Sequence, residues 1–367
     1  MIWVYIIALV IWTLFLIGIF SVVKTHPSTM PIEPVDQKIN VVIAFRNEGQ
    51  KLMACLSALS SSRGVSFPLR VIMVDDDSTD DSLARIEEAR KQFSNLDITV
   101  LSNEGSGKKS ALKTGLKKVD DGWIDFTDAD CQVQESTIAS MVKDGMKEDV
   151  AIVFGPVVYS HSNAWERWLA YENLNTQMVS EAFVKIKAPV MVNGGNMLVH
   201  SSKKDGYQES LQMDYASGDD VFFAQSASKA QFTGSYKMES AVLTDPPSDL
   251  HSLLSQRIRW ASKYAGYGRP TLRLLPPFIF LVNVIFLWLT IDWLFLSSLF
   301  NALTVLWVAK SMIEFSFHRS GFDKYRFNAE WWDGLLISLV YPLYFIVIGL
   351  AGLMSPSFQW KGRRYKH

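Results

Sequence analysis

The sequence of 367 residues has no excess of either charge, with 36 basic and 37 acidic side chains and a formal net charge of −1. Proteins that bind nucleic acid usually concentrate basic residues on one face, so this balance argues against a nucleic-acid partner. The two cysteines, Cys55 and Cys131, are too few for a disulfide framework or a cysteine metal cluster. The six histidines show no pairing at the spacing of metal ligands. These absences suit a reduced, cytoplasmic catalytic domain.

Charged residues are scarce in three long parts of the chain. The stretch Ile2 to Val23 holds none and is long enough to cross a hydrocarbon core of roughly 30 Å as a helix. No signal-peptide cleavage site is evident, which favours an uncleaved anchor over 1–23. The block Leu274 to about Ile313 is long enough for a hairpin of two spans, and Leu335 to Met354 matches one more. The sequence therefore predicts four spans, about three of them in a membrane region over 266–367 that ends in a basic tail.

Between these apolar ends, residues 36–265 alternate short apolar runs with polar stretches. The runs that indicate strands are Ile39–Ala44, Leu69–Val74, Ile98–Leu101, Trp123–Thr127 and Val150–Phe154. The stretches between them with helical spacing are Gly49–Ser60, Ser78–Phe93 and Lys108–Val119. Such repeats predict a layered α/β domain with parallel pairing and right-handed crossovers. Ligands bind such sheets at the carboxyl ends of the strands, so the residues that follow each strand are candidates for a site.

Acidic residues gather after two of these strands. Asp75-Asp76-Asp77 follows one strand and Asp128-Ala129-Asp130 follows another. The spacing of Asp128 and Asp130 places both carboxylates on one side of an extended chain, where they can share a divalent cation. A nucleotide diphosphate leaving group needs such a cation to neutralise its developing charge. The alternative for this segment by itself is a solvated acidic turn.

Two further segments combine residue types suited to group transfer. Asp219 and Asp220 precede a helical run, where they either complement the positive end of the helix dipole or supply a general base for an acceptor hydroxyl. The segment Gln256 to Trp260 joins two arginines, which can hold a diphosphate in a bidentate fork, to an aromatic ring that can stack on a sugar. The alternative for this second segment is a basic, aromatic border at the membrane interface.

The order of these segments resembles the membrane-integrated branch of inverting glycosyltransferase family 2. This branch includes synthases of cellulose, hyaluronan, chitin and poly-N-acetylglucosamine, and ceramide glucosyltransferase. The likeness covers roughly Asn40 to Trp260. The matching segments, in order, are Val41–Glu48, Val74–Asp80, Gly107–Leu112, Asp128–Asp130, Asn193–Asn196, Asp219–Asp220 and Gln256–Trp260. One departure is Lys113, which stands where many relatives carry Asn.

The resemblance implies a GT-A fold, the Rossmann-like fold of nucleotide-diphospho-sugar transferases, between an N-terminal transmembrane helix and a C-terminal helical membrane region. It also implies a UDP-sugar donor, Mg²⁺ or Mn²⁺, and a single displacement that inverts the anomeric carbon. The implied metal ligands are Asp128 and Asp130, and the implied general base is Asp220, beside Asp219. The other donor-binding residues implied are Ala44, Arg46, Glu48, Asp76, Lys108 and, again, Asp128. The implied acceptor and diphosphate contacts are Gly195, Asn196, Gln256, Arg257, Arg259 and Trp260.

The sequence therefore predicts an integral membrane enzyme that moves a sugar to a lipid-linked or growing glycan acceptor at the cytoplasmic face of the cell membrane. The alternative is a non-catalytic, membrane-bound, nucleotide-binding partner of a glycan export complex. The presence of Asp128, Asp130, Asp220 and Trp260 together favours the enzyme. Whether it adds one sugar or builds a polymer stays open, because polymer synthases usually have more spans than four.

The membrane topology has two interpretations. Nucleotide sugars are cytosolic, so the catalytic domain is expected inside, with Lys24 and the basic stretch Arg257 to Arg273 at the inner surface. The basic segments Arg319–Arg326 and Lys361–Lys366 flank the last apolar block, so they cannot both be inside if that block crosses. Either one segment departs from the positive-inside tendency, or a block is re-entrant or lies along the surface, with Glu330–Asp333 as an interfacial anchor.

Overall fold

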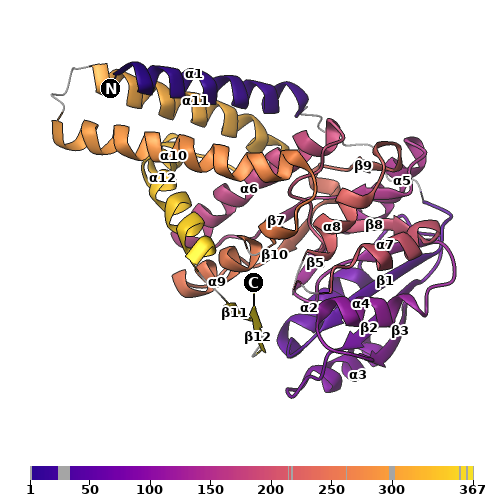
Figure 1. Cartoon of the computed structure of the whole chain (residues 1–367). Coiled ribbons are helices and arrows are strands. Elements are labelled where there is room, and N and C mark those ends of the chain that lie inside the picture. Colours follow the sequence, from indigo (N-terminus) through magenta and orange to yellow (C-terminus); the bar gives the residue numbers. More distant parts are fainter. Residues whose placement is uncertain are drawn as a thin grey trace.

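The structure is a computed structural model that describes residues 2–23, 34–213, 215, 218–261, 263–296, 302–354, 357–360 and 363–366. Long helices form a bundle on one side, and an α/β domain lies on the other (Figure 1). The long helices are α1 (Ile2–Val22), α6 (Ala164–Lys185), α9 (Leu250–Ala261), α10 (Pro270–Leu296), α11 (Ala302–Lys324) and α12 (Trp331–Met354). Helix α1 packs along α10 and α11, so the two ends of the chain build the bundle together. Lys24 and the side chains of the basic tail lie outside the described residues.

A seven-stranded sheet forms the centre of the α/β domain, in the order β3-β2-β1-β4-β8-β6-β9. Its strands are β1 (Ile39–Phe45), β2 (Leu69–Asp75), β3 (Leu96–Ser102), β4 (Trp123–Phe126), β6 (Ile152–Phe154), β8 (Met197–His200) and β9 (Phe232–Gly234). The first four are parallel, whereas β8 is antiparallel to both β4 and β6. All five predicted strands are present, with ends within two residues of those expected. Strands β1, β2 and β4 are almost entirely buried, as parallel strands covered by helices require.

Helices cover both faces of this sheet. They are α2 (Gly49–Ser60), α3 (Ser82–Gln92), α4 (Lys108–Leu116), α5 (Thr137–Lys147), α7 (Lys204–Ser210) and α8 (Asp219–Ser226). Alternate residues of β1 and β2 enter two hydrophobic clusters, one with α2, α3 and α5 and the other with α4, α7 and α8. A smaller sheet of β5 (Cys131–Val133), β10 (Val242–Thr244) and β7 (Val157–Tyr159) stands beside it. The predicted α/β class is confirmed.

Helix α6 joins the α/β domain to the bundle. Near its beginning, Arg167 Nη2 lies 2.6 Å from Asp333 Oδ2 of α12. Near its end, Glu181 Oε2 lies 2.5 Å from Lys324 Nζ of α11, and both side chains are almost fully buried. The buried Glu181–Lys324 pair fixes the geometry strongly, because removal of either partner would leave the other as an uncompensated buried charge. The position of α6 is therefore tied to the bundle at both ends.

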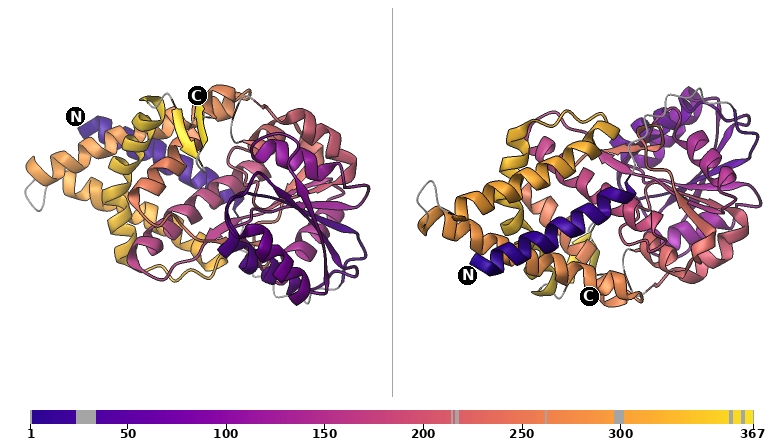
Figure 2. Two further views of the ribbon diagram at one scale, coloured as in Figure 1. Left: turned by 90° about the horizontal axis from the view of Figure 1, so that it is seen from below. Right: turned by 90° about the horizontal axis from the view of Figure 1, so that it is seen from above.

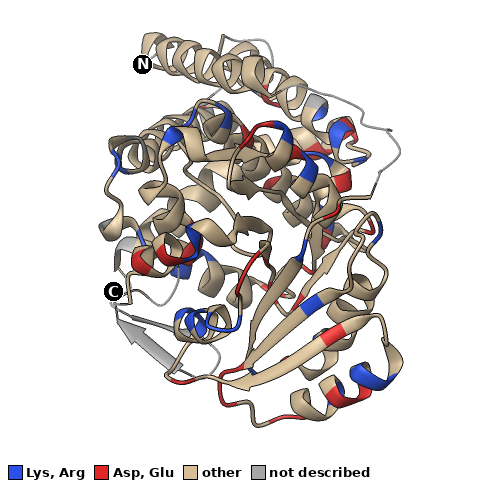
Figure 3. Ribbon diagram, turned by 90° about the vertical axis from the view of Figure 1, so that its right-hand side faces the viewer, with Lys and Arg blue, Asp and Glu red and all other residues tan. Residues whose placement is uncertain are grey.

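Three of the described helices are long and apolar enough to cross a membrane: Ile2–Val22, Leu272–Phe295 and Trp331–Gly352. Helix α11 is not among these three by hydropathy, although it packs along α1 and α10 in the bundle. It runs beyond the predicted end at Ile313 and holds Lys310 and Glu314, whose charged groups lie 2.7 Å apart. The hydroxyl of Ser338 in α12 lies 3.0 Å from the Lys310 amine and 2.5 Å from Glu314. These charges are paired inside the bundle, in contrast to α1, which carries no charge along its length (Figure 3).

Helix α12 lies at a steep angle to α1, α10 and α11 (Figures 1 and 2). Its beginning contacts α6 through Asp333, as described above. Near its end, Gly352 approaches α9 so closely that a Cβ there would lie 2.6 Å from that of Ala261. The next strand, β11 (Ser357–Trp360), pairs with β12 (Arg363–Lys366) and also contacts α9. The two ends of α12 thus contact helices α6 and α9, respectively.

Candidate active site

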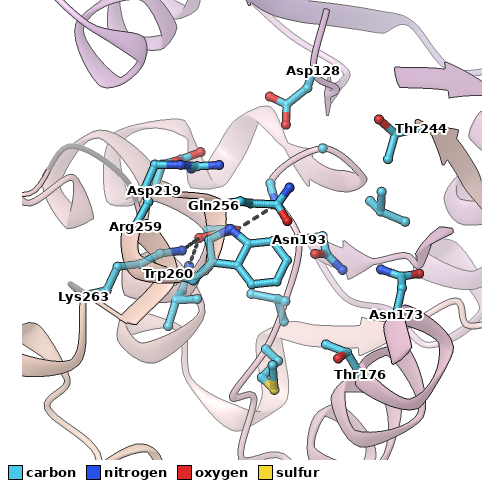
Figure 4. A pocket seen from close by; sticks show the side chains of 18 of the residues that line it. Asp128, Asn173, Thr176, Asn193, Asp219, Thr244, Gln256, Arg259, Trp260 and Lys263 are labelled. Carbon is cyan, nitrogen blue, oxygen red and sulfur yellow. Dashed lines mark hydrogen bonds and ion pairs between the residues drawn. The ribbon is translucent and has the colours of Figure 1, made fainter. Parts of the chain in front are cut away.

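A cavity of about 230 Å³ lies between the α/β domain, α6 and α9, beyond the carboxyl end of β4 (Figure 4). The predicted site residues that line it are Lys108, Asp128, Asp130, Gly195, Asp219, Asp220, Gln256, Arg259 and Trp260. The tertiary structure therefore brings together segments that are more than one hundred and twenty residues apart in the sequence. Six of the predicted site residues lie elsewhere: Ala44, Arg46, Glu48, Asp76, Asn196 and Arg257.

Lys108 stands between the carboxylates of the cavity. Its Nζ atom lies 2.7 Å from Asp128 Oδ1 and 3.7 Å from Asp219 Oδ2. Burial acts to lower the pKa of Lys108, but the negative charges of Asp128 and Asp219 raise it well above its usual value. The side chain is therefore a fixed cation at the first residue of α4, where the helix dipole adds to its attraction for an anion.

Asp220 is held by backbone donors. Gly194 donates its N–H to Oδ2 at 3.0 Å, and the N–H of Val221 lies 2.7 Å from Oδ1. The Lys263 amine lies 3.7 Å from the same Oδ1. These contacts fix the orientation of the carboxylate at the wall of the cavity. An oriented carboxylate is the geometric requirement for a general base.

The Gly194-Gly195 pair is needed because carboxylates pack directly against it. A Cβ on Gly194 would lie 3.0 Å from Asp219 Oδ2, and one on Gly195 would lie 3.1 Å from Asp128 Oδ2. Asn196, the next residue, is fully buried and donates from Nδ2 to two backbone carbonyls at 2.8 Å each. Asn196 therefore anchors the loop and does not face the cavity.

Asp128, Asp130 and Cys131 could hold a metal ion, since one possible ligand atom of each lies within 4.8 Å of the others. Burial, together with the charges of Asp130 and Asp128, raises the pKa of the Cys131 thiol well above its usual value. A buried thiol is a poor ligand for Mg²⁺ or Mn²⁺, which prefer oxygen. The two carboxylates fit such an ion, and further ligands would come from the oxygens of a bound diphosphate.

The predicted donor loops support this cluster from outside the cavity. Lys51 Nζ lies 3.7 Å from both Glu48 Oε2 and Asp130 Oδ2, which links the loop after β1 to the Asp128–Asp130 turn. Asp76 accepts from the N–H of Gly107 at 2.9 Å and from Asn103 Nδ2 at 2.8 Å, and so positions the beginning of α4. Its own carbonyl accepts from Arg46 Nη1 at 2.9 Å. Ala44 lies in β1, opposite Val74 of β2.

The residues of the Gln256 to Trp260 segment lie on two different faces of helix α9. Gln256, Arg259 and Trp260 are three and four residues apart, share one face of α9 and line the cavity. Arg257 lies on another face, where its Nη2 is 2.5 Å from Glu172 Oε2 and its Nε donates to the Tyr344 hydroxyl at 2.9 Å. Its guanidinium lies 4.3 Å from the Trp260 ring centroid. Arg257 therefore positions Trp260 and does not face a ligand.

Several residues that line the cavity are absent from the predicted site, among them one wall and one cation. The wall is the face of α6 that carries Asn173, Thr176 and Gln177. No motif marks it, because these residues read as the polar side of an ordinary helix. The cation is Lys263, four residues after Arg259 in the sequence, a spacing that could have indicated it.

Two family models match the sequence. The model described as glycosyl transferase family group 2 matches residues 123–352, and the model described as glycosyl transferase family 2 matches residues 40–205. The first match covers more than half of the 367 residues. The chain belongs to glycosyl transferase family group 2, which confirms the resemblance drawn from the motifs.

Similar proteins agree with this assignment. The undecaprenyl-phosphate 4-deoxy-4-formamido-L-arabinose transferase of Serratia proteamaculans is 31% identical over 145 residues, 39% of this chain and 44% of that protein. Glycosyltransferase AglE of Haloferax volcanii is 24% identical over 166 residues, 45% of this chain and 52% of that protein. The chain thus spans about half the length of the curated relatives it matches.

A solved structure shows the same fold. The mannosyltransferase PcManGT of Pyrobaculum calidifontis, in complex with GDP-Man and Mn²⁺, superposes with a TM-score of 0.53 at 16% identity, covering 96% of each chain. At this identity the likeness concerns the fold alone. The domain has the predicted GT-A fold, with apolar helices on both sides of it in the sequence.

Proposed function

We propose that this chain is an inverting glycosyltransferase that moves a sugar from a nucleoside-diphosphate sugar, UDP by the family resemblance, to a lipid-linked or growing glycan acceptor at the cytoplasmic face of the membrane. The observation that supports this most is the convergence of Lys108, Asp128, Asp219, Asp220 and Trp260 on one cavity. The names of two similar proteins support it as well, since one is called an undecaprenyl-phosphate sugar transferase and the other was solved with GDP-Man and Mn²⁺.

In the proposed reaction, Asp220 removes the proton of an acceptor hydroxyl. The hydroxyl oxygen forms a bond to the anomeric carbon as the bond between that carbon and the diphosphate oxygen breaks. The products are the glycosylated acceptor, the nucleoside diphosphate and a proton on Asp220. One displacement from the face opposite the leaving group inverts the configuration of the carbon.

The leaving group carries negative charge, and the cations of the cavity suit it. Lys108 and Arg259 line the cavity and can bind phosphate oxygens. Asp128 and Asp130 would hold Mg²⁺ or Mn²⁺, which supplies further neutralisation of the diphosphate charge when bound. Trp260 presents an aromatic ring to the acceptor sugar, supported from behind by Arg257.

The proposed orientation places the α/β domain in the cytoplasm, where nucleotide sugars are made, and the N-terminus of α1 outside. Helix α12 would then lie along the inner membrane surface. Both of its flanking segments stay on the side of the α/β domain in this arrangement, as the contacts of Asp333 and Gly352 suggest. The basic residues of these segments would then all follow the positive-inside tendency.

The test is release of nucleoside diphosphate by detergent-purified protein with Mn²⁺, a panel of UDP- and GDP-sugars and a membrane lipid extract. Asp220→Asn is expected to lower turnover by about 10² to 10⁴, the contribution of a general base. Asp205→Asn is the matched control, since Asp205 also lies in the first turn of a helix but is exposed and outside the cavity.

The proposal is supported if the protein turns over one donor in a reaction that requires lipid, and if this turnover is lost in Asp220→Asn but kept in Asp205→Asn. The same result would identify the donor. If neither the unmodified protein nor Asp220→Asn releases nucleoside diphosphate from any donor, the non-catalytic, nucleotide-binding partner is favoured instead.

A further inference from the structure

A tyrosine outside the predicted site lies directly behind two of its acidic segments. The ring of Tyr207, in α7, stacks on Phe126 of β4 with the ring centroids 4.5 Å apart, and it meets Phe223 of α8 edge-on at 5.0 Å. Phe126 ends the strand that leads to Asp128, and Phe223 lies three residues after Asp220. The tyrosine therefore fills the space between the strand and the helix that carry the carboxylates of the cavity.

The hydroxyl of Tyr207 is fully buried and has no hydrogen-bond partner among the described residues. Burial raises its pKa well above the usual value, and so do, in decreasing order, the charges of Asp219, Asp220 and Asp128. Tyr207 is not among the residues that line the cavity, so its hydroxyl lies behind the cavity wall, close to the acids. An unpaired buried hydroxyl needs an explanation, because phenylalanine would fill the same space without the cost of desolvating a polar group.

Asp219, the acid with the largest effect on this hydroxyl, is held only loosely by its cation. Among the described residues its carboxylate has one ion pair, with Lys108, whose Nζ lies 3.7 Å from Asp219 Oδ2. That distance is too long for a charge-assisted hydrogen bond. The same Nζ lies 2.7 Å from Asp128 Oδ1. Lys108 is also the cation proposed above for the diphosphate, so two acids and a bound donor compete for one ammonium group.

A donor that takes Lys108 leaves Asp219 as a buried charge without its cation. An uncompensated buried charge is strongly unfavourable, so it opposes donor binding unless another group stabilises the carboxylate. The Tyr207 hydroxyl is a buried hydrogen-bond donor without a partner, and a carboxylate accepts such donors strongly. One hydrogen bond between these two groups would satisfy both of them.

We propose that Tyr207 is a positioning residue for donor binding, whose hydroxyl donates a hydrogen bond to Asp219 when Lys108 turns to the diphosphate of the donor. This inference rests on the proposed function, which makes Lys108 a ligand of the diphosphate. No covalent bond changes in this step: the phenol keeps its proton, and only the partner of the Asp219 carboxylate changes. Tyr207 therefore favours binding of the donor and has no direct effect on binding of the acceptor.

The first measurement is the binding of UDP and of GDP, each with Mn²⁺, to the purified full-length protein by isothermal titration calorimetry. Tyr207→Phe keeps the ring and removes the hydroxyl, and it is expected to weaken binding roughly tenfold or more, the effect of one lost hydrogen bond to a charged group. Its Tm without added nucleotide is expected to stay the same or to rise, because the variant lacks an unpaired buried hydroxyl. A residue with a purely structural role would instead lower Tm.

Tyr325→Phe is the matched control. The Tyr325 hydroxyl is also buried and unpaired among the described residues, but Tyr325 follows α11 and lies outside the cavity. This variant is expected to bind either nucleotide like the unmodified protein.

The second measurement tests whether the effect passes through Asp219. Asp219→Ala removes the proposed acceptor, so adding Tyr207→Phe to it should change nucleotide binding by less than about twofold. If Asp219→Ala does not fold, Asp219→Asn takes its place, and the effect of Tyr207→Phe should then shrink roughly fivefold, since a hydrogen bond to a neutral amide is weaker. At saturating donor, the half-saturating amount of acceptor for Tyr207→Phe should match that of the unmodified protein.

The outcomes separate this inference from the proposed function. Weaker nucleotide binding in Tyr207→Phe, with an undiminished Tm and no such effect once Asp219 is replaced by Ala, supports the positioning role. Binding equal to that of Tyr325→Phe, an effect that persists in full without Asp219, or a lowered Tm with donor and acceptor affected alike overturns it. The glycosyltransferase proposal then still stands if the turnover of the unmodified protein is lost in Asp220→Asn. If the unmodified protein neither binds UDP or GDP nor turns over any donor, both proposals are overturned.

Discussion

The buried pair of Arg257 and Glu172 gives a sharp test of how the Gln256 to Trp260 segment works. The two side chains are 6% and 8% exposed, and their nearest charged atoms lie 2.5 Å apart. The motif by itself suggests that Arg257 binds the diphosphate, whereas the structure places it behind Trp260. Replacement of Arg257 by Met should therefore affect stability first and donor binding only indirectly.

The size of the expected stability loss follows from the buried charge that loses its partner in each single variant. Loss of one partner of a buried pair costs about 3–5 kcal/mol, because the remaining charge is desolvated without compensation. At roughly 1.3 °C for each kcal/mol in a protein of 367 residues, Arg257→Met is expected to lower Tm by about 5 °C. Glu172→Leu should have a similar effect. The double variant should recover most of the loss, since replacing both charges by apolar groups is often neutral.

Thermal unfolding of the purified full-length protein in one detergent measures all four forms. Donor KM and turnover are measured on the same samples below their transitions. Arg257→Met with an unchanged Tm and a strongly raised donor KM would refute the structural role and restore Arg257 as a diphosphate ligand. A double variant no more stable than the single variants would show that the pair is not the source of the stability.

Further predictions concern the metal site, an unpaired acid and the topology. Asp130→Asn is expected to raise the Mn²⁺ needed for half-maximal turnover at least tenfold, whereas Cys131→Ala leaves it within about twofold, because the ion prefers oxygen ligands; equal effects would place the thiol in the site. Burial raises the pKa of Asp125 to about 7, so the folded protein keeps a proton that the unfolded chain loses near pH 4. Stability should fall by about 4 kcal/mol from about pH 4 to pH 7 and then level off, and Asp125→Asn should remove this slope in thermal unfolding; an unchanged slope would assign it to other groups. Single cysteines at Trp331 and Met354, the exposed ends of α12, should react with a membrane-impermeant thiol reagent only after permeabilisation, since the native cysteines are buried; reaction of just one end in intact cells would show that α12 crosses the membrane.

Local patterns in the sequence are sufficient to predict the parallel strands and the acidic residues that follow them. Runs of β-branched residues such as Ile39–Phe45 can be stable only when buried on both faces, so their pairing and the edge where their loops meet are constrained locally. Asp128, Asp130 and Asp220 can be predicted as site residues because their positions next to strand or helix ends are readable from neighbouring residues. The order of these segments was enough to indicate the family.

Contacts between residues far apart in the sequence determine which face of each helix meets the cavity. Spacing shows that Arg257 and Arg259 point in different directions, but not which of them is aimed at the ligand. Glu172, which pairs with Arg257, and Tyr344, which binds it as well, are far away in the sequence.

Contacts with distant residues also determine the surroundings of α11 and of the α6 wall, which local sequence patterns do not show. Lys310 and Glu314 in α11 look unsuited to an apolar bundle until Ser338 of another helix completes their hydrogen bonds. Asn173 reads as an ordinary polar residue until the packing of α6 places it at the wall of the cavity. Local patterns determine which groups share a face, whereas long-range contacts determine where that face points and therefore which residues line the cavity.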